Sequence, residues 1–204
     1  MIITVSREFG SGGRELGKRL ADALNIPCYD HQIIEMIASE HGFNEEYVAN
    51  MSERSIEALY PMTIGHHFAM PPIGVMEQPI RVAAAQRKII ENFAAQGDCV
   101  IVGRCADVIL RDYQPLNLFI YADAESKVRR CMARAAEGEN LSEQEIRRQM
   151  KRIDKDRAQY HRMYDDGRWG DKENYHLCIN TSHREIKNLI PALAQFCKDW
   201  FAEQ

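Results

Sequence analysis

The chain has 204 residues, of which 45% are apolar and 27% charged, and its formal net charge at neutral pH is −4. This length and composition are typical of one globular domain with a sizeable core, and we expect residues 1–204 to form it. The acidic balance argues against a general nucleic-acid binder, which normally carries a basic excess. No apolar run approaches the length of a membrane span, so a membrane partner is not expected either.

Six cysteines are scattered along the chain without any C-x-x-C pair. Several lie within apolar runs, where a cysteine usually packs as a small hydrophobic residue. Free, buried thiols are typical of a reducing compartment. Because no charged and then apolar leader precedes the first apolar run, we expect a cytoplasmic protein.

Short apolar runs separated by amphipathic stretches predict an α/β fold. The expected strands are residues 2–5, 27–29, 99–102, 116–121 and 176–180. The expected helices cover about 14–24, 31–40, 44–59, 78–96, 124–137, 142–164 and 184–202. Strands that alternate with helices in this way predict an open parallel sheet with helices on both faces.

The first strand leads into a glycine-rich loop and then into a helix. The glycines are Gly10, Gly12 and Gly13. Such a loop lets backbone N–H groups face an anion, and the N-terminus of a helix adds roughly half a positive charge. The loop therefore predicts a phosphate-binding site, although the lysine of the P-loop pattern G-x-x-x-x-G-K-[ST] is missing.

A dinucleotide-binding turn is an alternative for the same loop. In a G-x-G-x-x-G pattern that begins at Gly10, the third glycine falls at Glu15, where a bulky charged residue blocks close packing of helix on strand. Asp30, after the second expected strand, could still bind a ribose. A tight turn without a ligand is a further alternative, which three glycines in four residues disfavour.

Residues 60–77 interrupt the alternation of strands and helices. Several prolines and Gly74 make a helix unfavourable there. A long connection is often a lid or a binding loop, and a surface loop without a function is equally compatible with the sequence. The pair His66-His67 is a weak metal signal, because no cysteine or carboxylate at ligand spacing accompanies it.

Gly103 and Arg104 directly follow the strand expected at 99–102. The planar guanidinium of Arg104 could hold a phosphate there with two parallel hydrogen bonds. A salt bridge to Asp107 is the structural alternative. Ligands of open parallel sheets bind beyond the carboxyl ends of the strands, where the glycine loop, Arg104 and residues 180–182 are all expected.

The stretch from Ser142 to Asp171 is dense in charges of both signs. Ser142 and Glu145 predict a capped helix start. A mixed-charge helix is usually a solvated surface laced with weak ion pairs. The same density of arginines would also suit a lid over a phosphoryl group in transfer, because that chemistry depends on positioning and charge neutralisation.

Four segments together resemble the cytidylate kinase-like family of nucleoside monophosphate kinases, a group of P-loop NTPases. They are residues 6–17, 27–30, 100–107 and 175–182, so the resemblance extends over nearly the whole chain. It implies a five-stranded parallel sheet and transfer of a phosphoryl group from ATP to a nucleoside monophosphate, with Mg²⁺. It also implies an acceptor-binding helical region at about 30–96 and a lid at about 138–172.

The resemblance also suggests roles for individual residues. The donor phosphates would be surrounded by Gly10, Ser11, Gly12, Gly13, Arg14 and Glu15. The acceptor side would hold Asp30, Arg104 and Asp107. Asp154 and Arg157 resemble an Asp-x-x-Arg pair of the lid, with Arg148 and Arg152 as further lid candidates. Among these, Arg14, Asp30, Arg104 and Arg157 are the expected catalytic residues.

The glycine loop departs from the family pattern. An ungapped comparison puts the P-loop lysine at Gly13 and the hydroxyl that binds magnesium at Glu15, whereas a shift by one puts Arg14 at the lysine position. Arg14 could supply the positive charge, and Glu15 could either bind Mg²⁺ or repel the phosphates. His31-Gln-Ile-Ile also replaces the run that follows the aspartate in authentic cytidylate kinases.

We therefore expect an ATP-dependent kinase of the cytidylate kinase-like group, whose acceptor is CMP, dCMP or a related small molecule. A nucleotide-binding sensor or pseudo-kinase without transfer activity is the main alternative, and the missing lysine favours it. A dinucleotide-dependent oxidoreductase is a third alternative. The sequence leaves the oligomeric state open.

Overall fold

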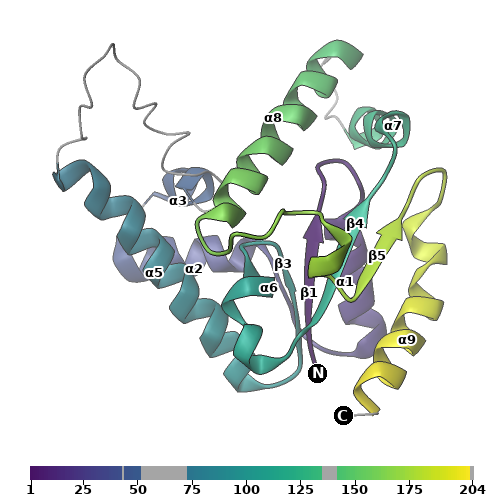
Figure 1. The fold of residues 1–204 in the computed structure, drawn as a ribbon, viewed down its shortest axis with the longest axis horizontal. Coiled ribbons are helices and arrows are strands. Elements are labelled where there is room, and N and C mark those ends of the chain that lie inside the picture. Colours follow the sequence, from purple (N-terminus) through teal and green to yellow (C-terminus); the bar gives the residue numbers. More distant parts are fainter. Residues whose placement is uncertain (43, 52–72, 135–141, 203–204) are drawn as a thin grey trace.

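The computed structural model describes residues 1–42, 44–51, 73–134 and 142–202. Its centre is a five-stranded parallel sheet in the order β2-β3-β1-β4-β5 (Figure 1). The strands are β1 (Ile2–Arg7), β2 (Cys28–Tyr29), β3 (Cys99–Val102), β4 (Leu116–Tyr121) and β5 (Leu177–Asn180). The predicted open parallel sheet is confirmed.

β1 is the central strand of the sheet. It pairs with β3 on one side and β4 on the other, so Val5 lies between Val102 and Leu118. These strands are continuous apolar runs because helices cover both faces of the sheet. Gly103 N–H donates to the carbonyl oxygen of Val5 at 3.0 Å, so the segments that follow β1 and β3 leave the sheet side by side.

Helices connect the strands and cover the sheet. They are α1 (Gly13–Leu24), α2 (His31–His41), α3 (Glu45–Met51), α5 (Ile73–Gln96), α6 (Ala106–Ile109), α7 (Ala124–Arg134), α8 (Glu143–Arg162) and α9 (Ile190–Ala202). Short 3-10 turns lie at Arg111–Tyr113, Lys172–Asn174 and Ile186–Asn188.

Two apolar cores hold the layers together. On one face of the sheet, α1 and α9 pack on the strands through residues such as Leu16, Leu20 and Leu193. On the other face, α2, α5 and α6 do so through residues such as Ile37 and Ile89. α7 and α8 lie beyond the carboxyl ends of the strands (Figure 1), where they pack on each other and on the glycine loop. This arrangement encloses the loop from above.

Some boundaries differ from the prediction. β1 continues to Arg7, and α5 begins at Ile73, so the expectation that residues 60–77 avoid a helix is wrong for 73–77. Gly74 lowers helix propensity by only about 1 kcal/mol, which the packing of the rest of this long helix outweighs. Residues 60–72, with His66-His67, lie outside the described residues.

The last helix begins later than the sequence predicts. Residues 184–189 include a 3-10 turn, and α9 starts only at Ile190. Pro191 explains this start, because a proline is tolerated in the first turn of a helix and breaks it further along.

The six cysteines are free, as expected. Burial raises the pKa values of Cys28, Cys99 and Cys197 to about 11, so these thiols are poor nucleophiles. In the described ranges, no helix combines the length and the apolar character that crossing a bilayer requires.

Candidate functional site

The glycine loop joins β1 to α1 at the carboxyl edge of the sheet. Gly10 and Gly12 have φ values of +75° and +85°, in the left-handed region that favours glycine. A Cβ atom added to Gly12 would lie 2.7 Å from Cδ1 of Ile186, and one added to Gly10 would lie 3.0 Å from Sγ of Cys131. Both conformation and space therefore require glycine at these two positions.

The N-terminus of α1 opens into a cavity. Gly12 occupies the N-cap position and gives no side-chain hydrogen bond, so the first N–H groups of the helix have no side-chain cap. The first four N–H groups of a helix also lack intrahelical acceptors. Because Gly12, Gly13 and Arg14 line the cavity, this end of α1 offers backbone donors and a positive potential to an anion.

Arginines dominate the rest of this cavity, which has a volume of about 360 Å³ and is named the arginine cavity below. Its arginines are Arg7, Arg14, Arg104, Arg130, Arg134 and Arg157. Glu8 and Asp30 are the acids that line it. This excess of guanidinium groups suits a ligand with several phosphates, because guanidinium binds phosphate oxygens in pairs.

Arg104 is the most buried of these arginines, with 7% of its surface exposed. Gly103, Arg104 and Cys105 have consecutive φ values of +76°, +59° and +53°, a conformation that is costly for residues other than glycine. Nε and Nη1 of Arg104 are buried and have no hydrogen-bond partner among the described residues. A strained turn thus holds a guanidinium whose donors lack an acceptor, as expected of an anion site.

Asp107 does not pair with Arg104 in the described structure. Its Oδ2 lies 3.3 Å from Nε2 of His161 and accepts a hydrogen bond from Ser6 Oγ at 3.4 Å. Together with Arg7, Arg104 and Arg157, Asp107 borders a small void of about 20 Å³ behind the arginine cavity. The salt bridge between Arg104 and Asp107, the structural alternative for Arg104, is therefore not formed.

Arg157 and Asp154 connect α8 to the glycine loop. Nη1 of Arg157 donates to the carbonyl oxygen of Arg7 at 3.1 Å, and Asp154 Oδ1 accepts from the Phe9 N–H at 2.7 Å. Burial is the main cause that raises the pKa of Asp154. Arg157 lines the arginine cavity and Asp154 does not, so Asp154 positions the loop while Arg157 can reach a ligand.

α7 holds the same loop from another side. Lys127 Nζ donates to Glu8 Oε2 at 3.0 Å. Arg130 donates to the carbonyl oxygens of Ser11, Thr181 and Arg184. Ser11 is fully buried, its Oγ donates to the Glu8 carbonyl, and its side chain takes no part in lining the cavity.

Arg148 and Arg152 are exposed and do not line the arginine cavity. At 100° per residue, they lie about 180° and 140° around α8 from Arg157. The structure therefore does not bring these two lid candidates to the site.

Arg14 and Asp30 form an ion pair at the rim of the arginine cavity, and 69% of the Arg14 side chain is exposed. Glu15 instead pairs with Arg19, at 2.8 Å, and with Arg134. It faces a neighbouring cavity and does not line the arginine cavity.

These pairings test the expected magnesium site. A carboxylate between two guanidinium groups is a poor ligand for Mg²⁺, which prefers free carboxylates together with phosphate oxygens and waters. The described residues contain no group of three or more histidines, cysteines or acids that could hold a metal ion. Glu15 and its surroundings therefore do not fit a protein-held Mg²⁺ site.

The neighbouring cavity, named the α7 cavity, has a volume of about 670 Å³. It lies between α7 and the segment 183–187, and it shares Arg130 and Arg134 with the arginine cavity. The two cavities therefore meet at these arginines, so an elongated ligand can extend from one into the other.

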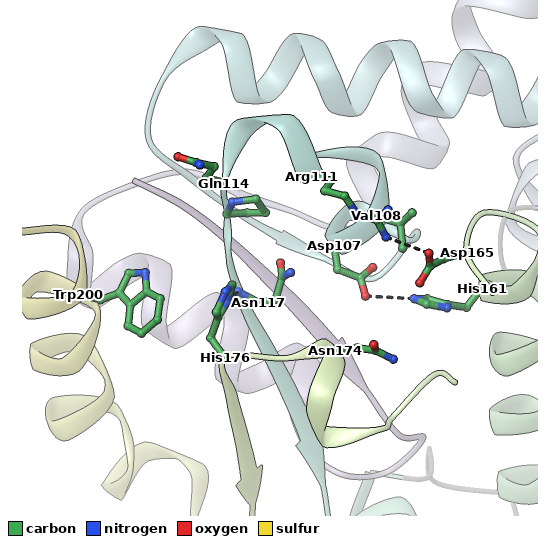
Figure 2. Close-up of a pocket in the computed structure, with 11 residues that line it drawn as sticks. Asp107, Val108, Arg111, Gln114, Asn117, His161, Asp165, Asn174, His176 and Trp200 are labelled. Carbon is green, nitrogen blue, oxygen red and sulfur yellow. Dashed lines mark hydrogen bonds and ion pairs between the residues drawn. The ribbon is translucent and has the colours of Figure 1, made fainter. Parts of the chain in front are cut away.

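A third cavity, named the Asp107–His161 cavity, has a volume of about 660 Å³ and lies elsewhere. Figure 2 shows Asp107 and His161 pointing toward one another, and Arg111 paired with Asp165 at 2.9 Å. Asn117, near the start of β4, also lines it. Its charged groups pair with each other, so it has no excess of either sign.

Sequence reasoning missed four residues of the site: Arg7, Lys127, Arg130 and Arg134. Arg130 and Arg134 are four residues apart on a helix that follows a strand directly, so their position could have indicated them. Arg7 was missed because β1 was expected to end at Val5. Only its contacts with the loop show its direction.

The sheet order also decides against the dinucleotide alternative. In the classic dinucleotide fold, the second strand lies beside the first. Here β3 lies between β2 and β1, so the connection after β1 runs past a neighbouring strand position. Glycine loop and Asp30 therefore do not stand on adjacent strands.

Comparison with known proteins supports the same fold. The structure is similar to that of an uncharacterized protein from Eubacterium ventriosum, with 27% sequence identity, coverage of 96% of this chain and 97% of that chain, and a TM-score of 0.68. No curated protein has a sequence that matches this chain.

Shikimate kinases have a similar fold. The enzyme from Bacteroides thetaiotaomicron is 13% identical, with a TM-score of 0.56 and coverage of 97% of this chain and 98% of that chain. The enzyme from Acinetobacter baumannii, in complex with shikimate, is 14% identical, with a TM-score of 0.52 and coverage of 97% and 93%. At these identities the likeness shows the fold alone.

The description "Cytidylate kinase-like family" matches residues 2–183. The match spans the glycine loop, the sheet up to its last strand, and α7 and α8. Family and fold together support nucleotide-dependent phosphoryl transfer as the general chemistry. The chain belongs to the cytidylate kinase-like family.

Proposed function

We propose that this protein transfers the terminal phosphoryl group of ATP to a small acceptor, with CMP, dCMP or a similar nucleoside monophosphate as the first candidates. The observation that carries this proposal is the arginine cavity. Six arginines gather there around a glycine loop, and buried donors of Arg104 have no partner among the described residues. An anion with several phosphates would satisfy these donors and offset the repulsion among the guanidinium groups.

The donor nucleotide would extend across two cavities. Its base and ribose would lie in the α7 cavity, and its phosphates would pass Arg130 and Arg134 to reach the glycine loop. The N–H groups at the start of α1 would then face the phosphates. Arg14, at the rim, would add charge when it leaves Asp30.

The acceptor would approach from the side of α2. Asp30, at the N-cap of α2, and Arg104 lie on this side of the cavity. Asp107 would act from behind, through the small void that it shares with Arg104. Residues of about 30–96 would then form the acceptor-binding region, and the region of about 138–172, which contains α8, would act as the lid.

The transfer itself needs no covalent intermediate with the protein. The acceptor oxygen attacks the γ-phosphorus as the bond to the β–γ bridging oxygen breaks, and ADP leaves. Arg104 and Arg157 would stabilise the charge on the transferred group because their guanidinium groups are held in place before reaction. P-loop kinases in general use Mg²⁺ with ATP, but the residues here form no metal centre, so no step depends on one.

A nucleotide sensor without transfer activity is the second candidate. The loop lacks the lysine, Arg14 is paired with Asp30, and Glu15 is paired with two arginines. In this alternative the cavity binds ATP, and the binding itself is the signal.

One experiment separates these functions. The purified protein is incubated with ATP and Mg²⁺ and with CMP, dCMP, UMP, AMP, GMP or shikimate, while ADP release and ATP binding are followed in parallel. ADP release stimulated by one acceptor would establish the kinase. Tight ATP binding without release with any acceptor would favour the sensor, and absence of ATP binding would overturn both.

A further inference from the structure

The glycine loop has no lysine, and Arg7 occupies the space that a side chain at Gly13 would need. We propose that Arg7 supplies, from the end of β1, the positive charge over the donor phosphates that a P-loop lysine supplies from the position of Gly13. The inference rests on the proposed function, because it assigns a role in binding the donor nucleotide.

Sterics connect the two positions. A Cβ atom added to Gly13 would overlap Cβ of Arg7 and would lie 3.0 Å from its Cγ. Protein interiors are close-packed, so a long side chain at position 13 and the side chain of Arg7 exclude each other. The loss of the lysine at Gly13 and the presence of Arg7 are therefore two aspects of one arrangement.

The side chain of Arg7 passes over Gly13 and continues to Gly103. A Cβ atom added to Gly103 would overlap Nη1 of Arg7 and would lie 2.7 Å from its Cζ. The guanidinium therefore reaches the turn that carries Arg104. Arg7 lines both the arginine cavity and the void behind it, where Arg104 and Arg157 also lie.

The sheet holds Arg7 firmly. Arg7 is the last residue of β1 and is paired with Ile120 of β4. Its carbonyl oxygen accepts a hydrogen bond from Arg157. A guanidinium presented from a central strand loses little freedom when a phosphate binds, and its planar fork can contact two phosphate oxygens.

Arg14 is the other candidate for the missing charge, and its geometry is less suitable. It lies at the rim with 69% of its side chain exposed, and it pairs with Asp30. An exposed, paired guanidinium neutralises phosphate charge less effectively than one held in a cavity, because solvent screens it. Arg7 therefore accounts better for phosphate binding without a lysine.

The test measures affinity against the number of phosphates. AMP, ADP and ATP are titrated calorimetrically into the wild type, Arg7→Ala, Arg7→Gln and the control Lys18→Ala, which changes an exposed residue of α1. We expect both Arg7 variants to bind ATP and ADP about 10- to 100-fold more weakly, with a much smaller change for AMP. The control should bind all three as the wild type does.

A charge transplant provides the rescue. In R7G/G13K the arginine side chain is removed and the lysine is restored, so the lysine has room, and most of the ATP affinity should return. The single variant Gly13→Lys should be destabilised in thermal unfolding, because its side chain overlaps Arg7.

Two results would overturn the inference while leaving the proposed function intact. One is ATP binding by both Arg7 variants with wild-type affinity. The other is an equal loss of AMP, ADP and ATP binding together with a lower melting temperature, which would give Arg7 a structural role. If the wild type itself does not bind ATP, the proposed function fails first.

Discussion

The arginine cavity and the Asp107–His161 cavity differ in how their charges are balanced. The Asp107–His161 cavity is the larger, at about 660 Å³ against about 360 Å³. Its charged groups are neutralised in pairs, Asp107 with His161 and Arg111 with Asp165. In the arginine cavity, guanidinium groups outnumber carboxylates, and Arg104 has buried donors without an acceptor.

This difference shows that volume is a poor guide to function in this molecule. An anion gains most where backbone N–H groups, a helix N-terminus and unsatisfied guanidinium donors converge. The arginine cavity combines all three features at the carboxyl edge of the sheet, where parallel sheets bind ligands. The predictions below test whether function follows charge balance.

The largest effect is expected for Arg104→Met. Phosphoryl transfer should fall by roughly 10²- to 10³-fold, because a positioned donor is lost. The free energy of unfolding of the ligand-free protein should rise by about 1–3 kcal/mol, because the buried, unsatisfied donors are removed. ADP release and urea unfolding measure the two effects. A loss of stability would instead show that Arg104 has a structural role.

Arg157→Ala should lower turnover by roughly 100-fold and weaken ATP binding far less, because Arg157 would act on the group in transfer. Steady-state kinetics and calorimetry separate the two effects. Lys155→Ala, which changes an exposed residue on the other side of α8, is the matched control and should change neither. Equal losses of turnover and binding in the Arg157 variant would contradict a role in transfer.

His161→Leu tests the other cavity. The substitution leaves the buried carboxylate of Asp107 without its imidazole partner, so the free energy of unfolding should fall by about 1–3 kcal/mol. ATP affinity should not change. If ATP affinity fell while stability did not, the Asp107–His161 cavity would take part in binding, and the comparison between the cavities would fail.

The smallest effect is expected at Asp123, which caps the helix that carries Arg130 and Arg134. Its carboxylate accepts from the Ser126 N–H at 2.6 Å, and this hydrogen bond is the main cause that lowers its pKa from 3.8 to about 2. A depressed folded-state pKa stabilises the protein at neutral pH, and this contribution fades as the pH falls from about 4 toward 2.

Asp123→Ala should therefore lower the melting temperature at neutral pH. The difference from the wild type should shrink as the pH is lowered through this range. A difference that is independent of pH would assign the effect to something other than the ionised cap.

The sequence by itself determined the α/β fold, the parallel sheet and the place of the glycine loop. Apolar runs and helical periodicity are local signals, so the strands at 99–102 and 116–121 have the predicted boundaries. The position of Arg104 at the carboxyl edge also follows from the chain order, because it comes directly after a buried strand.

Only the tertiary structure decided which charged side chains meet. Glu15 pairs with Arg134, more than one hundred residues away, and this contact removes Glu15 from the arginine cavity. Arg157 reaches the glycine loop, whereas Arg148 on the same helix points elsewhere. The direction of Arg7 depends on the space above Gly13 and Gly103. A side chain's direction depends on contacts between distant segments, and local sequence patterns carry little information about those contacts.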